Sequence, residues 1–367
     1  MKLLILVLAL LQQQPKEEKP VALPGSYSHP TLAFKIYLPA KWGVLPPEKD
    51  SKVSCSFATA SDDSFTPRMD LRVVRTKDDA ANIAQQYKTA FKSPKAYPDA
   101  KFPREGTLAG RSGDGAYFVA EFIETKTTTL TNAMYAFYVS GGRSYTLSFS
   151  VPKVTADKYL PAIEAAMKSL RIYDEPTLTK EQMAEFLEKY NAAADANSKK
   201  DYATAAKCFK RCTELLPAFP ECTSGLGVAH MKLKNYADAE TALLKAVELD
   251  PGDYTFNFNL GVCLLQQSKN DDAIKHLKKA TEIDPASESA LTNLGAAYLA
   301  KDDLKAAVET LQKAVKADDK SSTAHYNLGL AYEKSNDPKK AADEFRATLK
   351  IDAKHEQAKE ALKRVTK

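Results

Sequence analysis

Four glycines in the second half of the sequence lie 34 residues apart, at Gly227, Gly261, Gly295 and Gly329, and Ala193 lies 34 residues before the first. We call such a set of residues, one from each repeat, a column. Three further columns keep this period: Ala205, Ala239, Ala273, Ala307 and Ala341; Cys212, Ala246, Ala280, Ala314 and Thr348; and Pro217, Pro251, Pro285, Asp319 and Ala353. A fixed period of this length predicts a stack of one repeated supersecondary unit.

Apolar residues within each unit recur at the spacing of a helix, as at Leu260, Leu264 and Leu265. Turn residues such as Lys234-Asn235-Tyr236 then separate two helices. The glycine and alanine columns would let the paired helices approach closely. One pair cannot bury its own apolar faces, so the units must stack into a solenoid.

These residues resemble the tetratricopeptide repeat family. Its Leu-Gly pair recurs at Leu226-Gly227, Leu260-Gly261, Leu294-Gly295 and Leu328-Gly329, with Tyr298 and Tyr332 after the last two. Five units fit residues 186–353, with starts near Phe186, Pro220, Tyr254, Glu288 and Ser322. The first unit departs from the pattern, because Ala193 stands where glycine is expected.

The segments on either side of the five units also have predicted structures. Residues 175–185 would form a linker and the start of the first solenoid helix, with a capping box between Thr179 and Gln182. Residues 354–367 would form a capping helix with a polar outer face. The resemblance therefore implies an all-α superhelical solenoid.

The resemblance implies a binding site in a concave groove that is lined by side chains of the first helix of each unit. The predicted groove residues are Val228, Met231, Phe258, Asn259, Val262, Leu265, Asn293, Ala296, Leu299, Tyr326, Asn327 and Leu330. They are mainly neutral and apolar, which favours an apolar extended segment or helix as ligand. The basic residues with which some family members bind a C-terminal carboxylate are missing. Alternatively, these asparagines and small apolar residues are ordinary repeat filler.

The first half predicts a mixed structure of strands and helices. Strand-like runs occur at 31–38, Met69–Val74, Ala116–Thr125, Ala133–Val139 and Ser144–Val151, with a tight hairpin at 140–143. Helical patterns cover Asp78–Phe91 and Thr155–Leu170. An antiparallel sheet flanked by two helices, an α+β sandwich over residues 25–174, accounts for this order.

Three phrases in this half, LPAKW (38–42), YTLSFSVP (145–152) and MKSLRIYD (167–174), resemble the PsbP-like superfamily. That resemblance implies a small α/β/α domain with docking or accessory roles, and it carries over no catalytic residues.

Residues 1–24 begin with one lysine and an apolar run from Leu3 to Leu11. This run is too short to span a bilayer and fits a secretory signal, followed by a flexible tether. We expect export to the periplasm or the extracellular space, or tethering at a membrane by an uncleaved segment. A cytoplasmic location is the less favoured alternative.

The charges and cysteines exclude several classes of partner and site. Residues 176–367 carry 29 basic and 29 acidic residues, so the net charge of +5 belongs to the first half, too dispersed for nucleic acid. The five cysteines match no common zinc spacing. Cys212 and Cys222 could form a disulfide in an exported protein, or Cys212 could fill the small-residue column while Cys222 is a buried thiol.

No motif in the sequence indicates catalysis. GRSGDG (110–115) lacks the ending of a phosphate loop and is expected to be a turn between strands. Four of the five histidines fall inside the repeat region, but at different register positions, so the repetition does not bring them to one site. We predict no catalytic residue, no metal and no cofactor, and a non-enzymatic adaptor that holds a protein or peptide partner in the groove. Two alternatives stay open: a ligand-binding or enzymatic N-terminal domain with Asp70, Arg72 or Glu121 in a pocket, and a self-assembling scaffold of unknown oligomeric state.

Overall fold

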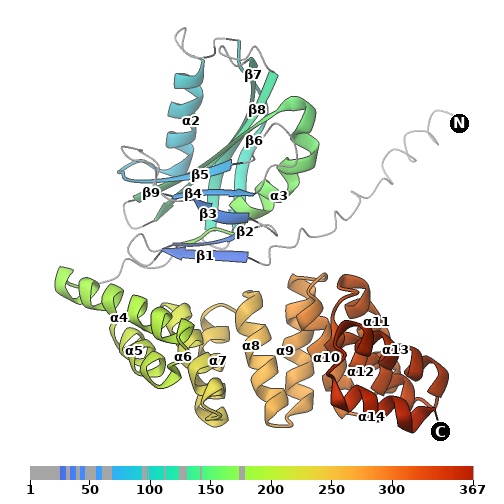
Figure 1. Ribbon diagram of the computed structural model, residues 1–367. Helices are drawn as coiled ribbons and strands as arrows, with labels where there is room; N and C mark the ends of the chain where they lie inside the picture. The colour runs from blue at the N-terminus through green and yellow to red at the C-terminus, as the bar shows by residue number, and fades with distance from the viewer. Residues whose placement is uncertain are drawn as a thin grey trace, which may run out of the picture.

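The computed structural model describes residues 25–29, 34–38, 42–45, 55–59, 68–92, 97, 99–110, 113–123, 130–140, 143–172 and 178–366. Strands dominate its N-terminal part and helices make up its C-terminal part (Figure 1). The expected signal or anchor and its tether, at residues 1–24, lie outside the described residues. Within those residues, no helix has the length and apolar character needed to cross a membrane.

Two antiparallel sheets form the strand-rich part. The larger has the order β3-β4-β5-β9-β8-β7-β6 among the described strands, and the smaller has the order β1-β2-β10. The larger sheet contains β3 (Trp42–Leu45), β4 (Cys55–Thr59), β5 (Arg68–Arg75), β6 (Lys101–Gly110), β7 (Gly113–Ile123), β8 (Leu130–Ser140) and β9 (Arg143–Pro152). The smaller contains β1 (Gly25–His29), β2 (Phe34–Leu38) and β10 (Arg171–Ile172).

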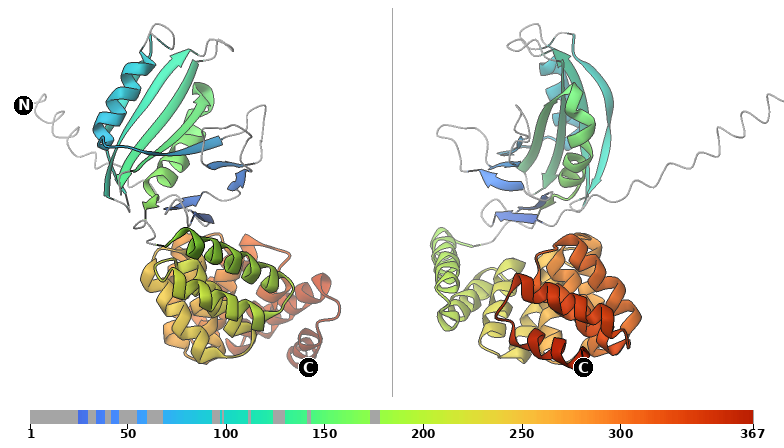
Figure 2. Two further views of the ribbon diagram at one scale, coloured as in Figure 1. Left: turned by 90° about the vertical axis from the view of Figure 1, so that its left-hand side faces the viewer. Right: turned by 45° about the vertical axis from the view of Figure 1, so that its right-hand side comes forward.

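Helices α2 (Ala80–Phe91) and α3 (Ala156–Lys168) pack on opposite faces of the larger sheet (Figure 2). Side chains of β7 alternate between the two faces, so Phe118 lies in the cluster with Ile83 of α2, whereas Val119 lies in the cluster with Ile163 of α3. A short 3₁₀ helix, Lys153–Thr155, precedes α3. The larger sheet thus has a helix and an apolar core on each side.

Five predicted strands and both predicted helices occur in this part of the chain. Pairing of Ser140 with Arg143 closes the predicted hairpin. The GRSGDG segment joins two paired strands, with Gly110 at the end of β6 and Gly113 to Gly115 within β7. Asp79 caps α2, which begins at Ala80. The sequence prediction missed β1, β3, β4, β6 and β10.

The C-terminal part is a solenoid of paired helices. The pairs are α4 (Lys180–Ser198) with α5 (Tyr202–Leu215), α6 (Pro220–Lys232) with α7 (Tyr236–Leu249), α8 (Tyr254–Gln266) with α9 (Asn270–Ile283), α10 (Glu288–Ala300) with α11 (Leu304–Ala317), and α12 (Ser322–Lys334) with α13 (Pro338–Ile351). Helix α14 (Glu356–Val365) covers the end of the stack. The predicted capping box between Thr179 and Gln182 opens α4 and is confirmed.

The glycine column occupies equivalent positions in successive pairs. A methyl group at Gly261 would lie 2.6 Å from Cγ of Leu277, and one at Gly227 would lie 2.6 Å from Cγ of Leu243. The first repeat differs, because its column position is Ala193. Its aromatic residue Phe209 lies against Gly225 of the next repeat, where a methyl group would be 2.6 Å from the ring.

The turn within each helix pair also repeats. Its residue with left-handed backbone recurs every 34 positions, at Lys200, Lys234, Ser268, Asp302 and Asn336, with φ between 59° and 64°. None of the five is glycine, so each turn holds an L-residue in a conformation that glycine adopts more easily.

Candidate peptide groove and interdomain junction

The predicted groove residues lie on the first helices α6, α8, α10 and α12, and none of them is fully exposed. Met231, Phe258 and Leu265 pack at the edge of one buried cluster, and Tyr326 and Leu330 pack at the edge of another. Each side chain is therefore anchored on the core while part of it stays accessible. Leu299 is the most buried of the set, at 9% exposure.

Aromatic contacts hold two members of this residue set, Phe258 and Tyr326. The ring of Phe258 stacks on Tyr254, with centroids 5.7 Å apart. Tyr326 contacts Phe345 of α13 at 5.9 Å and His355, the residue that caps α14, at 4.7 Å. A ligand would meet rings that are already fixed, which lowers the entropy lost on binding.

The predicted series of asparagines does not extend through every repeat of the solenoid. It comprises Asn259, Asn293 and Asn327, and the equivalent position in the second repeat is Gly225, where Phe209 leaves no space for a side chain. Asn293 donates its amide N–H to the Ser289 carbonyl of its own helix at 2.8 Å. This donor is already satisfied without a ligand.

A buried lysine joins the two parts of the chain. Lys35 of β2 is fully buried, and its Nζ lies 3.0 Å from Glu221 Oε1, 3.0 Å from Asp253 Oδ2 and 3.4 Å from Asp250 Oδ2. The same nitrogen lies 4.3 Å from the ring centroid of Phe256. The three carboxylates come from the N-terminal ends of α6 and α8 and from the turn before α8, so the contact crosses from the small sheet to the solenoid.

Burial acts to lower the pKa of Lys35, but the carboxylates of Glu221, Asp253 and Asp250 outweigh it and the pKa is raised. Lys35 is therefore a permanent cation in this junction. Tyr37 donates its hydroxyl to Asp250 Oδ2, and Arg171 Nη1 lies 3.4 Å from Asp250 Oδ1. Among the residues that the structure describes, two cations and a phenol thus contact these three carboxylates.

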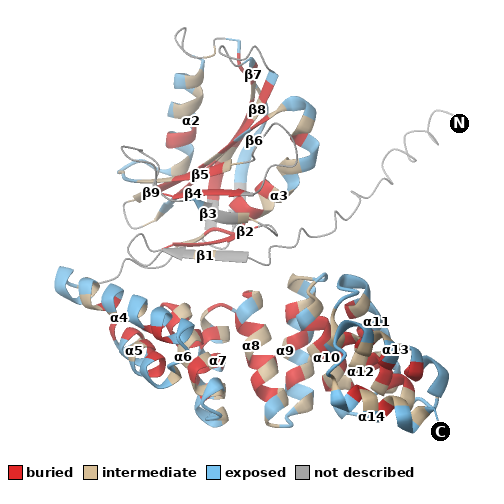
Figure 3. Cartoon of the chain, viewed as in Figure 1, coloured by how far each residue is buried: buried red, intermediate tan, exposed pale blue. Residues whose placement is uncertain are grey.

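Strand β2 shows what the sequence prediction missed. Phe34, Ile36 and Leu38 point into the core of the N-terminal part, as their alternation predicts. Lys35 and Tyr37 are buried too, so the whole of β2 is buried (Figure 3). The solenoid covers this second face. The sequence contains one indication of this contact. Glu221 is charged, whereas the residues at the same groove position in the third to fifth repeats are neutral.

The two cysteines of the proposed disulfide lie together as free, buried thiols. A hydrogen bond from Cys222 lowers the pKa of Cys212, whereas burial raises the pKa of Cys222. Cys212 also contacts the Phe186 carbonyl at 3.8 Å. The bonded form of the pair stays a prediction that depends on export.

Two of the three candidate catalytic groups of the N-terminal part, Asp70 and Glu121, occur in ion pairs. Asp70 Oδ1 accepts from Arg68 Nε at 2.7 Å and from Ser56 Oγ at 2.7 Å. Glu121 Oε2 lies 2.7 Å from Lys153 Nζ. Arg72 lies opposite Thr146 in the backbone register of β5 and β9. Bonded partners of this kind are typical of a structural role for Asp70 and Glu121.

Models of the tetratricopeptide repeat family match residues 190–254, 224–288, 264–323 and 322–355. Residues 190–355 are tetratricopeptide repeats. All these matches lie in the C-terminal half, so the resemblance of the first half to the PsbP-like superfamily stays a prediction. No curated protein sequence gives a significant match.

Several solved structures are similar to the solenoid. MamA from Desulfovibrio magneticus RS-1, from residue 41 to its end, is 24% identical, with 47% of this chain and 97% of that chain covered and a TM-score of 0.44. A second MamA structure is 22% identical, with coverage of 48% and 96% and a TM-score of 0.43. YrrB, described as a TPR protein with an unusual peptide-binding site, is 21% identical, with coverage of 50% and 95% and a TM-score of 0.45.

Proposed function

We propose that this protein is a non-enzymatic interaction scaffold that holds a peptide or helix of a partner protein in the concave face of its repeats. The observation that carries the proposal is the set of partly exposed apolar side chains on the first helices α6, α8 and α12, five of which pack at the edge of a buried cluster. Apolar anchors of this kind, fixed before binding, suit an apolar segment of a partner.

Selection from a random peptide library on the whole chain tests this function. We expect enriched peptides with apolar anchor residues, and weaker binding to a Phe258→Ala, Asn259→Ala, Asn293→Ala variant by about tenfold or more, because truncating a central anchor costs about 1–2 kcal/mol. Lys313→Ala on the second helix α11 is the matched control and should leave binding unchanged. Failure to enrich any peptide, or equal binding to the triple variant, would overturn the proposal.

Export forms a second part of the proposal, supported by the apolar run from Leu3 to Leu11 after a basic residue. N-terminal sequencing of the protein purified from its native cells tests it. A mature chain that starts within residues 12–25 is expected for a cleaved signal, and an intact Met1 in the membrane fraction is expected for an anchor. An intact chain in the cytoplasm would refute export.

A further inference from the structure

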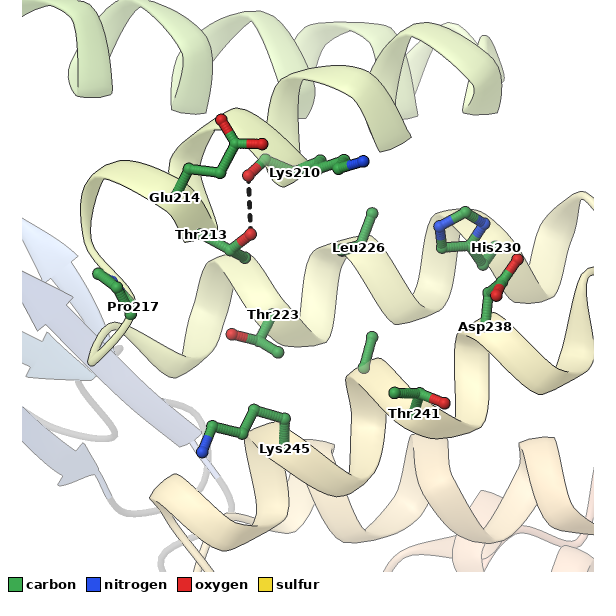
Figure 4. Close-up of a pocket in the computed structure, with 11 residues that line it drawn as sticks. Lys210, Thr213, Glu214, Pro217, Thr223, Leu226, His230, Asp238, Thr241 and Lys245 are labelled. Carbon is green, nitrogen blue, oxygen red and sulfur yellow. Dashed lines mark hydrogen bonds between the residues drawn. The ribbon is translucent and has the colours of Figure 1, made fainter.

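The second repeat has a pocket on the side of α6 that faces away from the groove residues. Its volume is about 590 Å³, and it lies between α5 and α7 with α6 as its floor (Figure 4). Thr223, Leu226 and His230 of α6 line it. With 3.6 residues per turn, these positions lie nearly opposite to Val228 and Met231 of the predicted groove.

Larger side chains fill the equivalent space in other repeats. Thr223 and Ala242 of the pocket correspond, 34 residues later, to Asn257 and His276, whose side chains are joined by a hydrogen bond of 3.2 Å. In the last repeat the equivalent pair is His325 and Glu344, joined at 2.6 Å. The pocket is open in the second repeat because both of its residues at these positions are small.

Tyrosines occupy the position of His230 in the fourth and fifth repeats. Tyr298 lies under Nζ of Lys278, at 5.6 Å from the ring centroid, and the hydroxyl of Tyr332 accepts from Gln312 Nε2 at 2.8 Å. His230 is smaller, and its Nδ1 is buried with no hydrogen-bond partner among the residues that the structure describes. A buried polar atom without a partner costs about 1–3 kcal/mol.

We infer that this pocket binds a tyrosine side chain from a segment of a partner protein. Leu226 and Ala242 offer apolar surface to the faces of a ring, and Thr223, Thr241 and His230 offer groups that hydrogen-bond to a phenol. The ligand thereby supplies the polar aromatic ring that the fourth and fifth repeats supply from their own sequence.

The charges around the pocket favour a neutral ring over a phosphorylated one. Lys210 and Lys245 are matched by Glu214 and Asp238, so the rim has no net charge. A phosphate would bring about two negative charges to a rim that offers no excess of positive charge to balance them. The pocket is separate from the concave groove. An experiment can therefore refute this inference without affecting the function proposed above.

Titration of the whole chain with 4-methylphenol, followed by methyl and side-chain resonances of Leu226, Ala242 and His230, tests the inference. Toluene is the matched ligand without the hydroxyl, and we expect it to bind about 2- to 10-fold more weakly, the worth of one hydrogen bond. Absence of saturable shifts at these residues with 4-methylphenol would overturn the proposal.

Variants that carry the residues of other repeats at the pocket positions distinguish a loss of the pocket from a loss of the fold. Thr223→His with Ala242→Glu reproduces the pair of the fifth repeat, and we expect it to abolish the shifts. His230→Leu reproduces the third repeat, and we expect it to remove the preference for 4-methylphenol over toluene. The triple groove variant should bind 4-methylphenol like the natural protein. Unchanged binding and preference in the pocket variants would contradict the proposal.

Discussion

At Gly261 the absence of a side chain sets the distance between two helices. A methyl group there would lie 2.6 Å from Cγ of Leu277, which is fully buried and cannot move aside. Gly261→Ala gains about 1 kcal/mol of helix propensity but overpacks a core at a cost of about 1–3 kcal/mol. We therefore expect the free energy of unfolding to fall by about 1 kcal/mol, as measured by urea denaturation.

The double variant Gly261→Ala with Leu277→Ala is the control for this prediction. It removes the atom that the new methyl group meets, so the two changes should destabilise the protein less than the sum of their separate effects. Additive effects, or a gain of stability from Gly261→Ala alone, would contradict the packing argument.

The left-handed turn residue Lys234 gives an opposite prediction. Its φ of 64° disfavours a side chain, and we expect Lys234→Gly to raise the free energy of unfolding by about 1 kcal/mol. Lys245→Gly, within helix α7, is the matched control and should lower it by about 1 kcal/mol. Thermal unfolding of both variants measures these changes in stability. A loss of stability in Lys234→Gly would show that the turn is not strained.

At the scale of elements, helix α14 protects the end of the solenoid. Ala358 and Ala361 are buried against α13, and Arg364 Nη2 donates to Glu333 Oε2 at 2.7 Å. Deleting residues 354–367 would expose the cluster around Phe345 and should cost on the order of 3 kcal/mol. Hydrogen exchange should rise in α12 and α13 first, whereas deletion of Lys367 alone should change nothing. Equal exchange in both deletions would refute this role.

Sequence periodicity predicts the helices well because the same positions of each repeat are buried in the same way. The strands were harder to predict. Pro103 and Gly106 disfavour a strand in the interior of a sheet, yet they occur in β6, which is an edge strand of the larger sheet. Edge position is a property of the tertiary structure, and nothing local in the sequence of β6 indicates it.

The groove residues could be named from the sequence because their register follows from the repeat. The pocket of the second repeat could not, since it depends on two small residues, Thr223 and Ala242, from different helices. It becomes visible only when α6 and α7 lie side by side.

At the scale of the whole molecule, the two parts of the chain meet at the junction around Lys35. The small sheet lies over one edge of the solenoid, near the starts of α6 and α8 (Figures 1 and 2). The alternation of β2 predicts one buried face, and the second is buried only because the solenoid covers it. In this arrangement Glu221 is bound within the chain, whereas the apolar groove residues from Val228 of α6 onward remain for a partner.

Lys35→Met tests this arrangement most directly. The variant keeps most of the length of the side chain but removes a buried cation from the buried Asp250 and Asp253 and the partly exposed Glu221. Breaking a buried pair in this way costs about 3–5 kcal/mol. Lys245→Met, at an exposed site on α7, is the matched control.

The measurement is hydrogen exchange of β2 and of residues 250–256, followed by mass spectrometry of the two variants and the natural protein. We predict faster exchange in both segments in Lys35→Met, with the rest of the solenoid unchanged, and no difference in Lys245→Met. Exchange in Lys35→Met equal to that of the natural protein would contradict the claim that this buried lysine joins the two parts into one body.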